Sequence, residues 1–488
     1  MVSPRIETNL IVDGRVVEGE RTIEVRNPAW PDEVVGICHA ANAKQAEEAI
    51  EAAWKAYPVW RRLGIKERAN ILEKASARWQ RIMLEWPVLQ TREQGMVFSE
   101  SVGEVLYPTF LFGVSSFLAD MLIEQEAIQR DYRGWMRVKR DPIGVVSIIT
   151  PWNAPLILTW LPVTAALLAG NTVVIKPASY TPLTISRTVE ALADIFPPGV
   201  INIVPGSASE VGTVLTTHPL VGKVSLTGTC ETGTLVMRNA ADTTKKITLE
   251  LGGNDPAIIL PDIDWSLGKF QQLLWGVFTT AGQICMAIKR IYVHESIFQR
   301  FIDDFVDVAS QIVVGNGLDE RVTMGPLNNK EQLEKVRGLV QEAEKRGAKV
   351  IRTGKILDKK TFNKGYFHLP TIITGVDHTY RVVKEEQFGP VIPIMPFRDD
   401  EEAVRLANDT MYGLCSSVWT TDEDRGAKIA EQLEAGYTWL NQHGPLALEL
   451  MAPFGGQKRS GIGRSYGLEG LLAYTESHTI VSKTPVRL

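Results

Sequence analysis

The sequence contains few cysteines, and their spacing excludes two of the roles that cysteines commonly have. The chain has 488 residues and four cysteines, which form no C-x-x-C pair: Cys38, Cys230, Cys285 and Cys415. This spacing argues against a disulfide framework and against a structural zinc site, and it fits a reducing environment. The 7 histidines form no H-x-x-x-H pair, so we expect no metal site.

The sequence also lacks a strong charge imbalance and an N-terminal apolar segment. Its formal net charge of −5 is small for this length and gives no reason to expect nucleic acid or an anionic membrane as a partner. Residues 1–15 contain no apolar run of the kind that a signal peptide carries. We therefore expect a cytoplasmic protein that binds neither nucleic acid nor a membrane.

One segment, residues 144–175, lacks charged side chains altogether. It is long enough to cross a bilayer, but three prolines and two asparagines interrupt it. A membrane-spanning helix would have to accommodate all of them. A buried strand, a loop, a buried helix and a second buried strand explain the segment better.

What the sequence does contain is a regular alternation of short apolar runs and helical segments. The apolar runs are 144–149, 172–175, 200–204, 224–226 and 247–251, and the helical segments are 155–169, 181–195, 207–217 and 231–240. This βαβ series predicts a parallel sheet that is covered by helices on both faces. A second alternating region after Pro256, with a helix near 264–281, predicts a second α/β domain.

Two loops at the expected carboxyl ends of strands are suited to bind phosphate. Each of them, 205–212 and 226–233, joins a strand to a helix through small residues. The free N–H groups and the dipole of a helix N-terminus favour an anion there. Neither loop has the G-x-G-x-x-G pattern, and each alone is equally consistent with a plain turn. Together they make a dinucleotide plausible.

Three residues are candidates for covalent chemistry. Cys285 can supply a thiolate, which adds readily to carbonyl carbon, although a cysteine among apolar residues is often a packing residue. Glu250 lies in an apolar run, where burial would raise its pKa toward the range of a general base; a structural ion pair is the alternative. Asn153 can donate its amide N–H to an oxyanion, or form an Asx turn.

Two charged residues are candidates for binding a cofactor. Lys176 ends an apolar strand, where it could bind ribose hydroxyls or phosphate, or remain a solvated charge. Glu386 precedes Phe388, so the carboxylate could hold a ribose while the ring packs on a flat cofactor. A surface glutamate before a turn is the alternative.

Taken together, these segments resemble the aldehyde dehydrogenase superfamily, from about Asn27 to the C-terminus. The matching motifs occur in order at 150–153, 176–178, 226–228, 249–253, 282–285, 386–390 and 453–456. The resemblance implies an α/β fold with a Rossmann-like cofactor-binding domain (1–121 and 142–252), an α/β catalytic domain (253–470) and a small β bridging element (122–141 and 471–488). Because edge strands of such an element need partners, we expect a homodimer or homotetramer.

The resemblance also implies oxidation of an aldehyde to its carboxylic acid with NAD or NADP. Cys285 would form a thiohemiacetal whose oxyanion the Asn153 amide and the Cys285 N–H hold, and Glu250 would activate the water that hydrolyses the later thioester. The catalytic residues would be Cys285, Glu250, Asn153 and Lys176. The cofactor-binding residues would be Thr150, Trp152, Lys176, Ser179, Gly206, Gly228, Thr229, Gly252, Glu386 and Phe388.

Three departures from the superfamily pattern affect the details. Ser179 stands where NAD-preferring members commonly carry a glutamate, so NADP should be tolerated. Ala208 replaces a glycine in many members, a mild change that still permits the turn. Ser465 replaces a glutamate linked to proton release, which questions any proton path through this position.

The substrate pocket that the resemblance implies is apolar throughout. Its residues are Ala154, Leu158, Leu161, Ile284, Met286, Leu448 and Phe454. Members that act on succinic semialdehyde have an arginine at the position of Leu161, so we expect an uncharged aromatic or aliphatic aldehyde here. The alternatives are an NADP-dependent semialdehyde dehydrogenase, a coenzyme A-acylating enzyme, against which Glu250 argues, and a catalytically silent scaffold.

Overall fold

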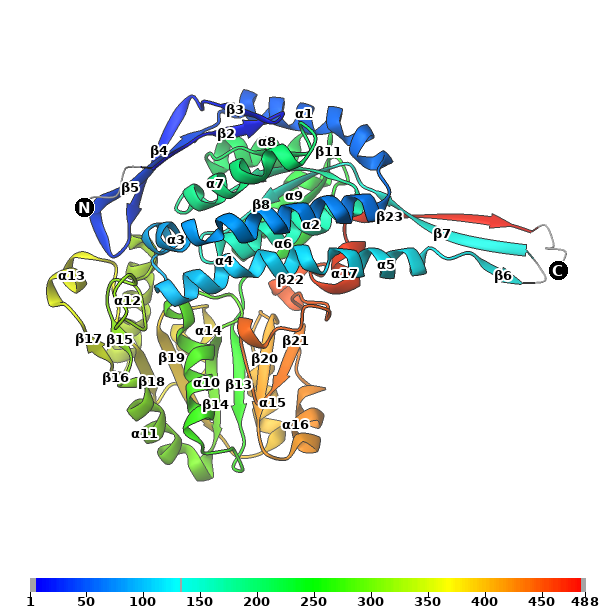
Figure 1. The fold of residues 1–488 in the computed structure, drawn as a ribbon. Helices are drawn as coiled ribbons and strands as arrows, with labels where there is room; N and C mark the ends of the chain where they lie inside the picture. Colours follow the sequence, from blue (N-terminus) through cyan, green and yellow to red (C-terminus); the bar gives the residue numbers. More distant parts are fainter. Residues whose placement is uncertain (1–5, 132–133, 484–488) are drawn as a thin grey trace.

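The computed structural model describes residues 6–131 and 134–483, and it consists of two α/β lobes and a projecting arm (Figure 1). The upper lobe contains most of the N-terminal half of the chain, and the lower lobe contains most of the C-terminal half. The parts of the predicted domains at 1–5, 132–133 and 484–488 lie outside the described residues. The predicted fold class, a Rossmann-like α/β unit with a second α/β sheet and a small β element, is confirmed.

The upper lobe surrounds an eight-stranded sheet with the order β22-β12-β11-β8-β9-β10-β2-β3. Its strands are β2 (Leu10–Val12), β3 (Arg15–Val17), β8 (Val145–Ile149), β9 (Thr172–Lys176), β10 (Ile201–Ile203), β11 (Val221–Thr227), β12 (Lys246–Glu250) and β22 (Gly461–Ile462). The central five, β12 to β10, are parallel and correspond to the five predicted apolar runs. β2 and β22 add antiparallel strands on either side.

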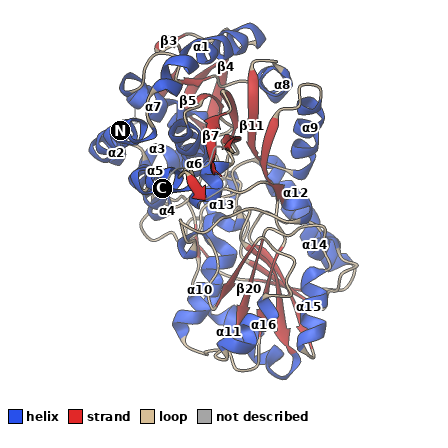
Figure 2. Ribbon diagram, turned by 90° about the vertical axis from the view of Figure 1, so that its right-hand side faces the viewer, coloured by secondary structure: helices blue, strands red, loops and turns tan. Residues whose placement is uncertain are grey.

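Helices cover both faces of this sheet because its strands alternate their side chains between two apolar cores. Val145 packs with α1 (Ala43–Arg62), α8 (Thr213–Thr217) and α9 (Cys230–Ala241), whereas Val146 packs with α2 (Ile65–Ile82), α6 (Pro155–Ala169) and α7 (Pro182–Leu192). Figure 2 shows these two layers of helices. The helix predicted at 207–217 differs in one respect: it begins as a π-helical turn, Ala208–Gly212.

The lower lobe has a seven-stranded sheet with the order β16-β18-β19-β14-β13-β20-β21. The strands are β13 (Asp255–Ile259), β14 (Ile288–His294), β16 (Lys349–Arg352), β18 (Thr371–Thr374), β19 (Val391–Phe397), β20 (Cys415–Trp419) and β21 (Tyr437–Leu440). The helices are α10 (Leu267–Phe278), α11 (Phe298–Ala309), α12 (Lys330–Lys345), α13 (Lys359–Lys364), α14 (Arg381–Lys384), α15 (Asp400–Asn408) and α16 (Glu423–Ala430). All strand pairs are parallel except β16 with β18.

The arm is a three-stranded antiparallel sheet with the order β23-β7-β6. It pairs β7 (Gly134–Pro142) with β23 (Thr475–Ser482) and with β6 (Gln129–Asp131), and it projects to the right in Figure 1. The smaller elements are β1 (Ile6–Thr8), β4 (Arg21–Asn27), β5 (Trp30–Ala40), β15 (Val313–Val314), β17 (Lys355–Ile356), α3 (Pro87–Gln94), α4 (Phe98–Gly113), α5 (Ser115–Gln125) and α17 (Gly467–Leu472).

One helical stretch, Phe98–Gln125, is long and apolar enough to cross a membrane by length and composition alone. It comprises α4 and α5, which pack against α2, α6 and α17. The core helix of a globular protein has the same length and composition, so this stretch is weak evidence for a membrane span. The uncharged segment 144–175 instead forms β8, a loop, α6 and β9.

Candidate active site

The two sheets meet where β12 ends and β13 begins, with only residues 251–254 between them. The carboxyl edge of the upper sheet therefore faces the amino edge of the lower sheet. Thr150 and Lys176 lie at the ends of β8 and β9 on this edge, beside Glu250 at the end of β12. Cys285 precedes β14 on the opposite side, so the junction brings together residues that are far apart in the sequence.

A run of left-handed residues positions the loop that carries Cys285. The helix predicted to continue to residue 281 ends at Phe278, because Thr280, Ala281 and Gly282 have φ values of 51°, 55° and 71°. A β-branched residue rarely adopts this conformation. Here the Glu100 carboxylate on α4 accepts the Thr280 N–H at 2.9 Å and stabilises the turn.

Gln283 fixes the same loop from its other side. Its side-chain N–H donates to the Thr280 carbonyl at 2.8 Å, and its side-chain oxygen accepts the N–H of Asn328 at 2.9 Å. The side chain of Gln283 is fully buried, so these contacts are shielded from water. The Asn153 amide, also buried, donates to the Gln283 carbonyl at 2.9 Å. The amide predicted to face an oxyanion therefore lies against the loop of Cys285.

Glu250 is a buried carboxyl group, as the sequence predicts. Burial raises the pKa of Glu250 to about 7, although the Ser465 hydroxyl and the charge of Arg464 act in the opposite direction. Among the described residues, its Oε1 atom is buried without a hydrogen-bond partner. A buried carboxylate oxygen with a free acceptor position can bind a water molecule and take a proton from it.

Cys285 is partly exposed and lies among several charged groups. Burial raises the pKa of its thiol to about 12; the charge of Lys289 opposes this rise, whereas Glu250, Glu386 and Asp255 add to it. A thiol with this pKa is protonated at neutral pH, so its attack requires a proton acceptor. Glu250 acts on the thiol through its charge and itself titrates near neutral pH, so it is suited to accept the proton.

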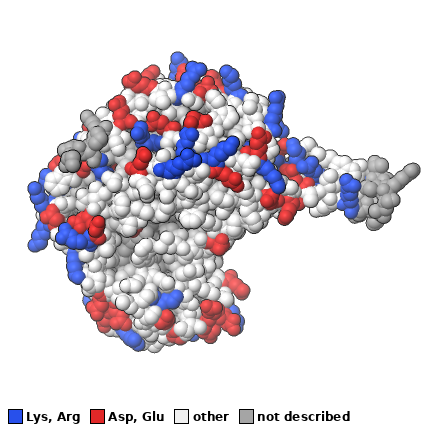
Figure 3. Space-filling model, in the orientation of Figure 1, with Lys and Arg blue, Asp and Glu red and all other residues white. Residues whose placement is uncertain are grey.

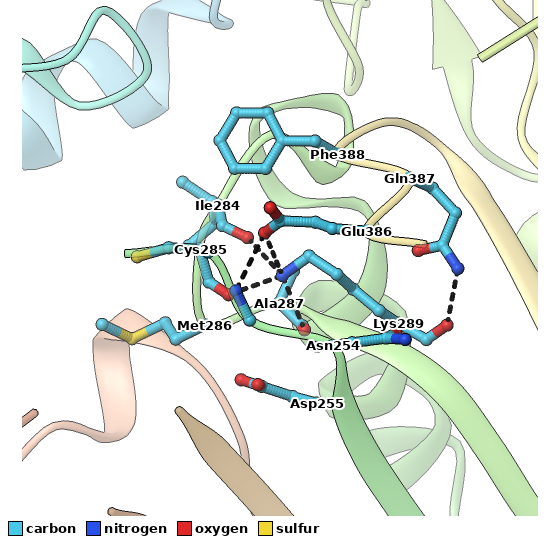
Figure 4. A network of polar contacts seen from close by, with 12 residues as sticks. Asn254, Asp255, Ile284, Cys285, Met286, Ala287, Lys289, Glu386, Gln387 and Phe388 are labelled. Carbon is cyan, nitrogen blue, oxygen red and sulfur yellow. Dashed lines mark hydrogen bonds and ion pairs between the residues drawn. The ribbon is translucent and has the colours of Figure 1, made fainter. Parts of the chain in front are cut away.

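Lys289 is a site residue that sequence reasoning missed. Its ammonium donates to the carbonyls of Ile284 at 2.9 Å and Cys285 at 2.5 Å, and it lies 3.4 Å from Glu386 Oε1 (Figure 4). A lysine only four residues after Cys285, at the start of β14, was the available signal, because such a charge is costly to bury unless it has partners. Glu100 and Gln283 were missed as well, because their partners are distant or are backbone groups.

Four of the predicted cofactor-binding residues lie close to the junction. Burial lowers the pKa of the Lys176 ammonium to about 8, and the ammonium donates to the Pro177 carbonyl at 3.2 Å. Glu386 accepts the Gly253 N–H at 3.1 Å. The Phe388 ring lies 5.5 Å from the ring of Trp152, edge to face. A buried ammonium with spare donors, a held carboxylate and a pair of rings fit the ribose and the flat base of a dinucleotide.

The remaining cofactor-binding candidates follow the strands of the upper sheet. Thr150 is buried, and its N–H donates to the Lys176 carbonyl at 3.1 Å, while Ser179 is exposed. Gly228 donates its N–H to the Glu250 carbonyl at 3.0 Å, and the Thr229 hydroxyl caps α9. At Gly206 and Gly252, a side chain would collide with Val211 and with the Glu386 carboxylate, respectively.

The structure brings together five of the seven predicted substrate-pocket residues. One apolar cluster contains Leu161, Ile284, Met286 and Phe454, and Leu448 and Cys285 pack against it. Ala154 and Leu158 lie nearby in sequence, at the start of α6, but are not part of this cluster. A groove of about 830 Å³ between α10, α11 and the start of α4 is lined by none of the seven.

Two α/β sheets that meet at a thiol, a buried carboxyl group and a buried ammonium are features that fit a dinucleotide-dependent oxidoreductase. Residues 16–480 match the aldehyde dehydrogenase family. The chain belongs to this family, whose members oxidise aldehydes with NAD(P)⁺. The described residues contain no group of three or more histidine, cysteine, aspartate or glutamate side chains that could hold a metal ion.

Individual relatives cover nearly the whole chain. Cytosolic aldehyde dehydrogenase 1 of Rattus norvegicus is 37% identical and covers 94% of this chain and 91% of its own. 3-Sulfolactaldehyde dehydrogenase of Pseudomonas putida is also 37% identical, with 96% of both chains covered. The crystal structure of betaine aldehyde dehydrogenase from Staphylococcus aureus with NAD⁺ is 34% identical and superimposes with a TM-score of 0.91 over 99% of this chain and 95% of that one.

Proposed function

We propose that this aldehyde dehydrogenase is of the hydrolytic type, with Cys285 as the nucleophile and Glu250 as the base. The observation that carries the proposal is the convergence of Cys285, Glu250 and Asn153 from three separate segments at the junction of the sheets. The buried, partly unpartnered carboxyl group of Glu250 supports hydrolysis rather than transfer of the acyl group to coenzyme A. Adding coenzyme A should therefore not increase the formation of NAD(P)H.

In this proposal, the Cys285 sulfur adds to the aldehyde carbon and its proton passes to Glu250. The Asn153 amide and the Cys285 N–H stabilise the oxyanion of the resulting thiohemiacetal. NAD(P)⁺, when bound, accepts the hydride that leaves the former aldehyde carbon. Glu250 then releases this proton to solvent and takes another from the water that attacks the thioester. It passes that second proton to the Cys285 sulfur, so the thiol re-forms as the carboxylic acid leaves.

The proposed cofactor site accepts both NAD⁺ and NADP⁺. Lys176 and Glu386 would bind the two riboses, while Phe388 and Trp152 would flank the cofactor. Thr150, Gly206, Gly228, Thr229 and Gly252 would lie along its remaining length. Ser179 is exposed and uncharged beside the adenosine ribose in this arrangement, so nothing there would repel a 2′-phosphate.

Replacing Ser179 with glutamate tests this placement. Ser179→Glu should raise the KM for NADP⁺ at least about tenfold, because the new carboxylate would face the 2′-phosphate, and it should change the KM for NAD⁺ much less. The measurement is steady-state kinetics with each cofactor. Ser179→Ala, which adds no charge, serves as the control, and an unchanged cofactor ratio in Ser179→Glu would mean that the adenosine site lies elsewhere.

The proposed substrate is an uncharged aromatic or aliphatic aldehyde. Cys285 packs against an apolar cluster that includes Ile284 and Met286, and the surface between the two lobes is largely free of charged side chains in Figure 3. The test is NAD(P)H formation with benzaldehyde, hexanal and succinic semialdehyde in parallel. Faster turnover of the two neutral aldehydes is expected, and a clear preference for succinic semialdehyde would overturn this assignment while leaving the chemistry intact.

We further propose that the three predicted domains correspond to the upper lobe, the lower lobe and the arm, and that the arm joins subunits. Both outer strands of the arm, β6 and β23, are edges of its sheet, and β23 carries the exposed residues Ile480 and Val481. Such edges favour pairing with another subunit. A homodimer or homotetramer in the cytoplasm is expected, and light scattering would measure its mass.

A further inference from the structure

Lys289 is a buried cation that contacts the nucleophile loop and the Glu386 segment together. Its side chain is only 3% exposed, and it lies at the second position of β14, between Ile288 and the buried Arg290. Figure 4 shows its ammonium between the carbonyls of Ile284 and Cys285 on one side and the Glu386 carboxylate on the other. Burial of an ammonium is unfavourable unless such partners compensate for the lost hydration. The steps proposed above give this residue no role.

The contact with Ile284 determines the direction of a second group. The peptide bond between Ile284 and Cys285 is planar, and in a trans peptide the C=O and the N–H point in opposite directions. Because the Lys289 ammonium holds the Ile284 oxygen at 2.9 Å, it also directs the Cys285 N–H away from this ammonium. This N–H is the backbone donor that the proposed function assigns to the oxyanion.

The charges around the Cys285 thiol give Lys289 a second effect. The titratable groups that act on the thiol come from five other parts of the fold: Glu250 at the end of β12, Asp255 at the start of β13, Glu386 before β19, Cys415 at the start of β20 and Tyr466 before α17. The carboxylates among them raise the pKa of the thiol, and the charge of Lys289 lowers it. Loss of this cation would leave three carboxylates acting on the thiol without compensation.

We propose that Lys289 is a positioning residue that anchors the Ile284–Cys285 peptide and supplies the positive charge that offsets the carboxylates around the Cys285 thiol. The proposal rests on the role of Cys285 as the nucleophile. A neutral donor at this position could hold the two carbonyls, but it could not offset the charge of the carboxylates. This explains why a lysine occupies the position.

The test is the rate at which iodoacetamide alkylates Cys285 across a range of pH, followed by mass spectrometry of the modified peptide. Below the pKa of a thiol, this rate follows the fraction of thiolate. In Lys289→Met, the alkylation profile should shift upward by about one to three pH units, so that alkylation at pH 8 is at least about tenfold slower. Lys289→Gln, which keeps a donor for the carbonyls but removes the charge, should shift the profile in the same direction.

A second buried lysine provides a matched control. Lys223 is likewise buried, lies on β11 rather than β14, and donates to the Thr248 hydroxyl at 2.6 Å instead of to the loop of Cys285. Lys223→Met makes the same substitution and should leave the alkylation profile unchanged. Thermal unfolding of all three variants establishes that the compared proteins are folded.

Two outcomes would overturn the proposal: a folded Lys289 variant, either Met or Gln, with the wild-type profile, or an equal shift in Lys223→Met. The assay requires neither aldehyde nor NAD(P)⁺, so a negative result would remove the role of Lys289 and leave the proposed dehydrogenase mechanism standing. Failure of that mechanism would appear instead as aldehyde turnover by a variant that lacks Cys285. The alkylation assay does not measure turnover, so the two failures are distinguishable.

Discussion

Replacing Cys285 with alanine should lower the aldehyde-dependent formation of NAD(P)H by about 10⁴-fold or more. The expected loss is large because the covalent route, with its thiohemiacetal and thioester, depends on the sulfur that the substitution removes. Affinity for NAD(P)⁺ should change little, because the proposed ribose contacts come from Lys176 and Glu386. The measurements are turnover by absorbance and cofactor affinity by fluorescence titration.

Cys38→Ala is the matched control for this substitution. Cys38 is another free cysteine, is fully buried in β5, and belongs to a small apolar cluster separate from that of Cys285. It should lower stability by no more than about 1–2 kcal/mol and retain turnover. If Cys285→Ala retained turnover at a rate near that of wild type, Cys285 would not be the nucleophile, whatever else the site contains.

Replacing Glu250 with glutamine should slow both halves of the reaction, because the same carboxyl group accepts the Cys285 thiol proton and activates the hydrolytic water. The burst of one equivalent of NAD(P)H per subunit should become slower, and steady-state turnover should fall by about 10²- to 10⁴-fold. Rapid-mixing kinetics would measure the burst, and intact-protein mass spectrometry would detect the acyl group on Cys285. A normal steady-state rate would exclude Glu250 as the base. An unchanged burst followed by slow turnover would instead mean that Glu250 activates the water but does not accept the thiol proton.

The pH dependence of the wild-type enzyme follows from the same carboxyl group. Burial raises the pKa of Glu250 to about 7, and only the ionised form can accept a proton. The group is therefore largely protonated and inactive below pH 7, and ionised above it, so kcat should rise with pH through about 7 and then level off. Glu250→Gln should lack this rise, and a wild-type kcat that does not change between pH 6 and 8 would contradict the assignment.

Local patterns in the sequence predicted the parts of the fold that depend on nearby residues. The apolar runs and helical periods of residues 144–251 identify the parallel strands, because burial on both faces requires continuous apolar runs. The turn at Asp13-Gly14 between β2 and β3 and the capping box of Asn42 with Gln45 at the start of α1 likewise involve only residues that are close in the sequence.

The parts that could not be predicted depend on contacts between distant residues. The end of α10 at Phe278 requires the contact between Thr280 and Glu100, which are 180 positions apart. The contacts of Lys289 with Glu386 and of Asn153 with the Gln283 carbonyl arise only once the two sheets are joined. The superfamily resemblance indicated Cys285, Glu250 and Asn153, but their shared environment is a property of the folded junction.

The four-residue connection between β12 and β13 has a consequence for how such an enzyme can diversify. A side chain at Gly252 would collide with the Glu386 carboxylate, and one at Gly253 would lie 2.7 Å from the Cys285 carbonyl. Both positions are therefore closed to substitution by the packing of the reactive groups themselves. Leu448 and Leu450, by contrast, lie in a partly exposed segment against the apolar cluster. New substrate preferences, whether natural or engineered, are accessible through that segment without disturbing the connection on which the chemistry depends.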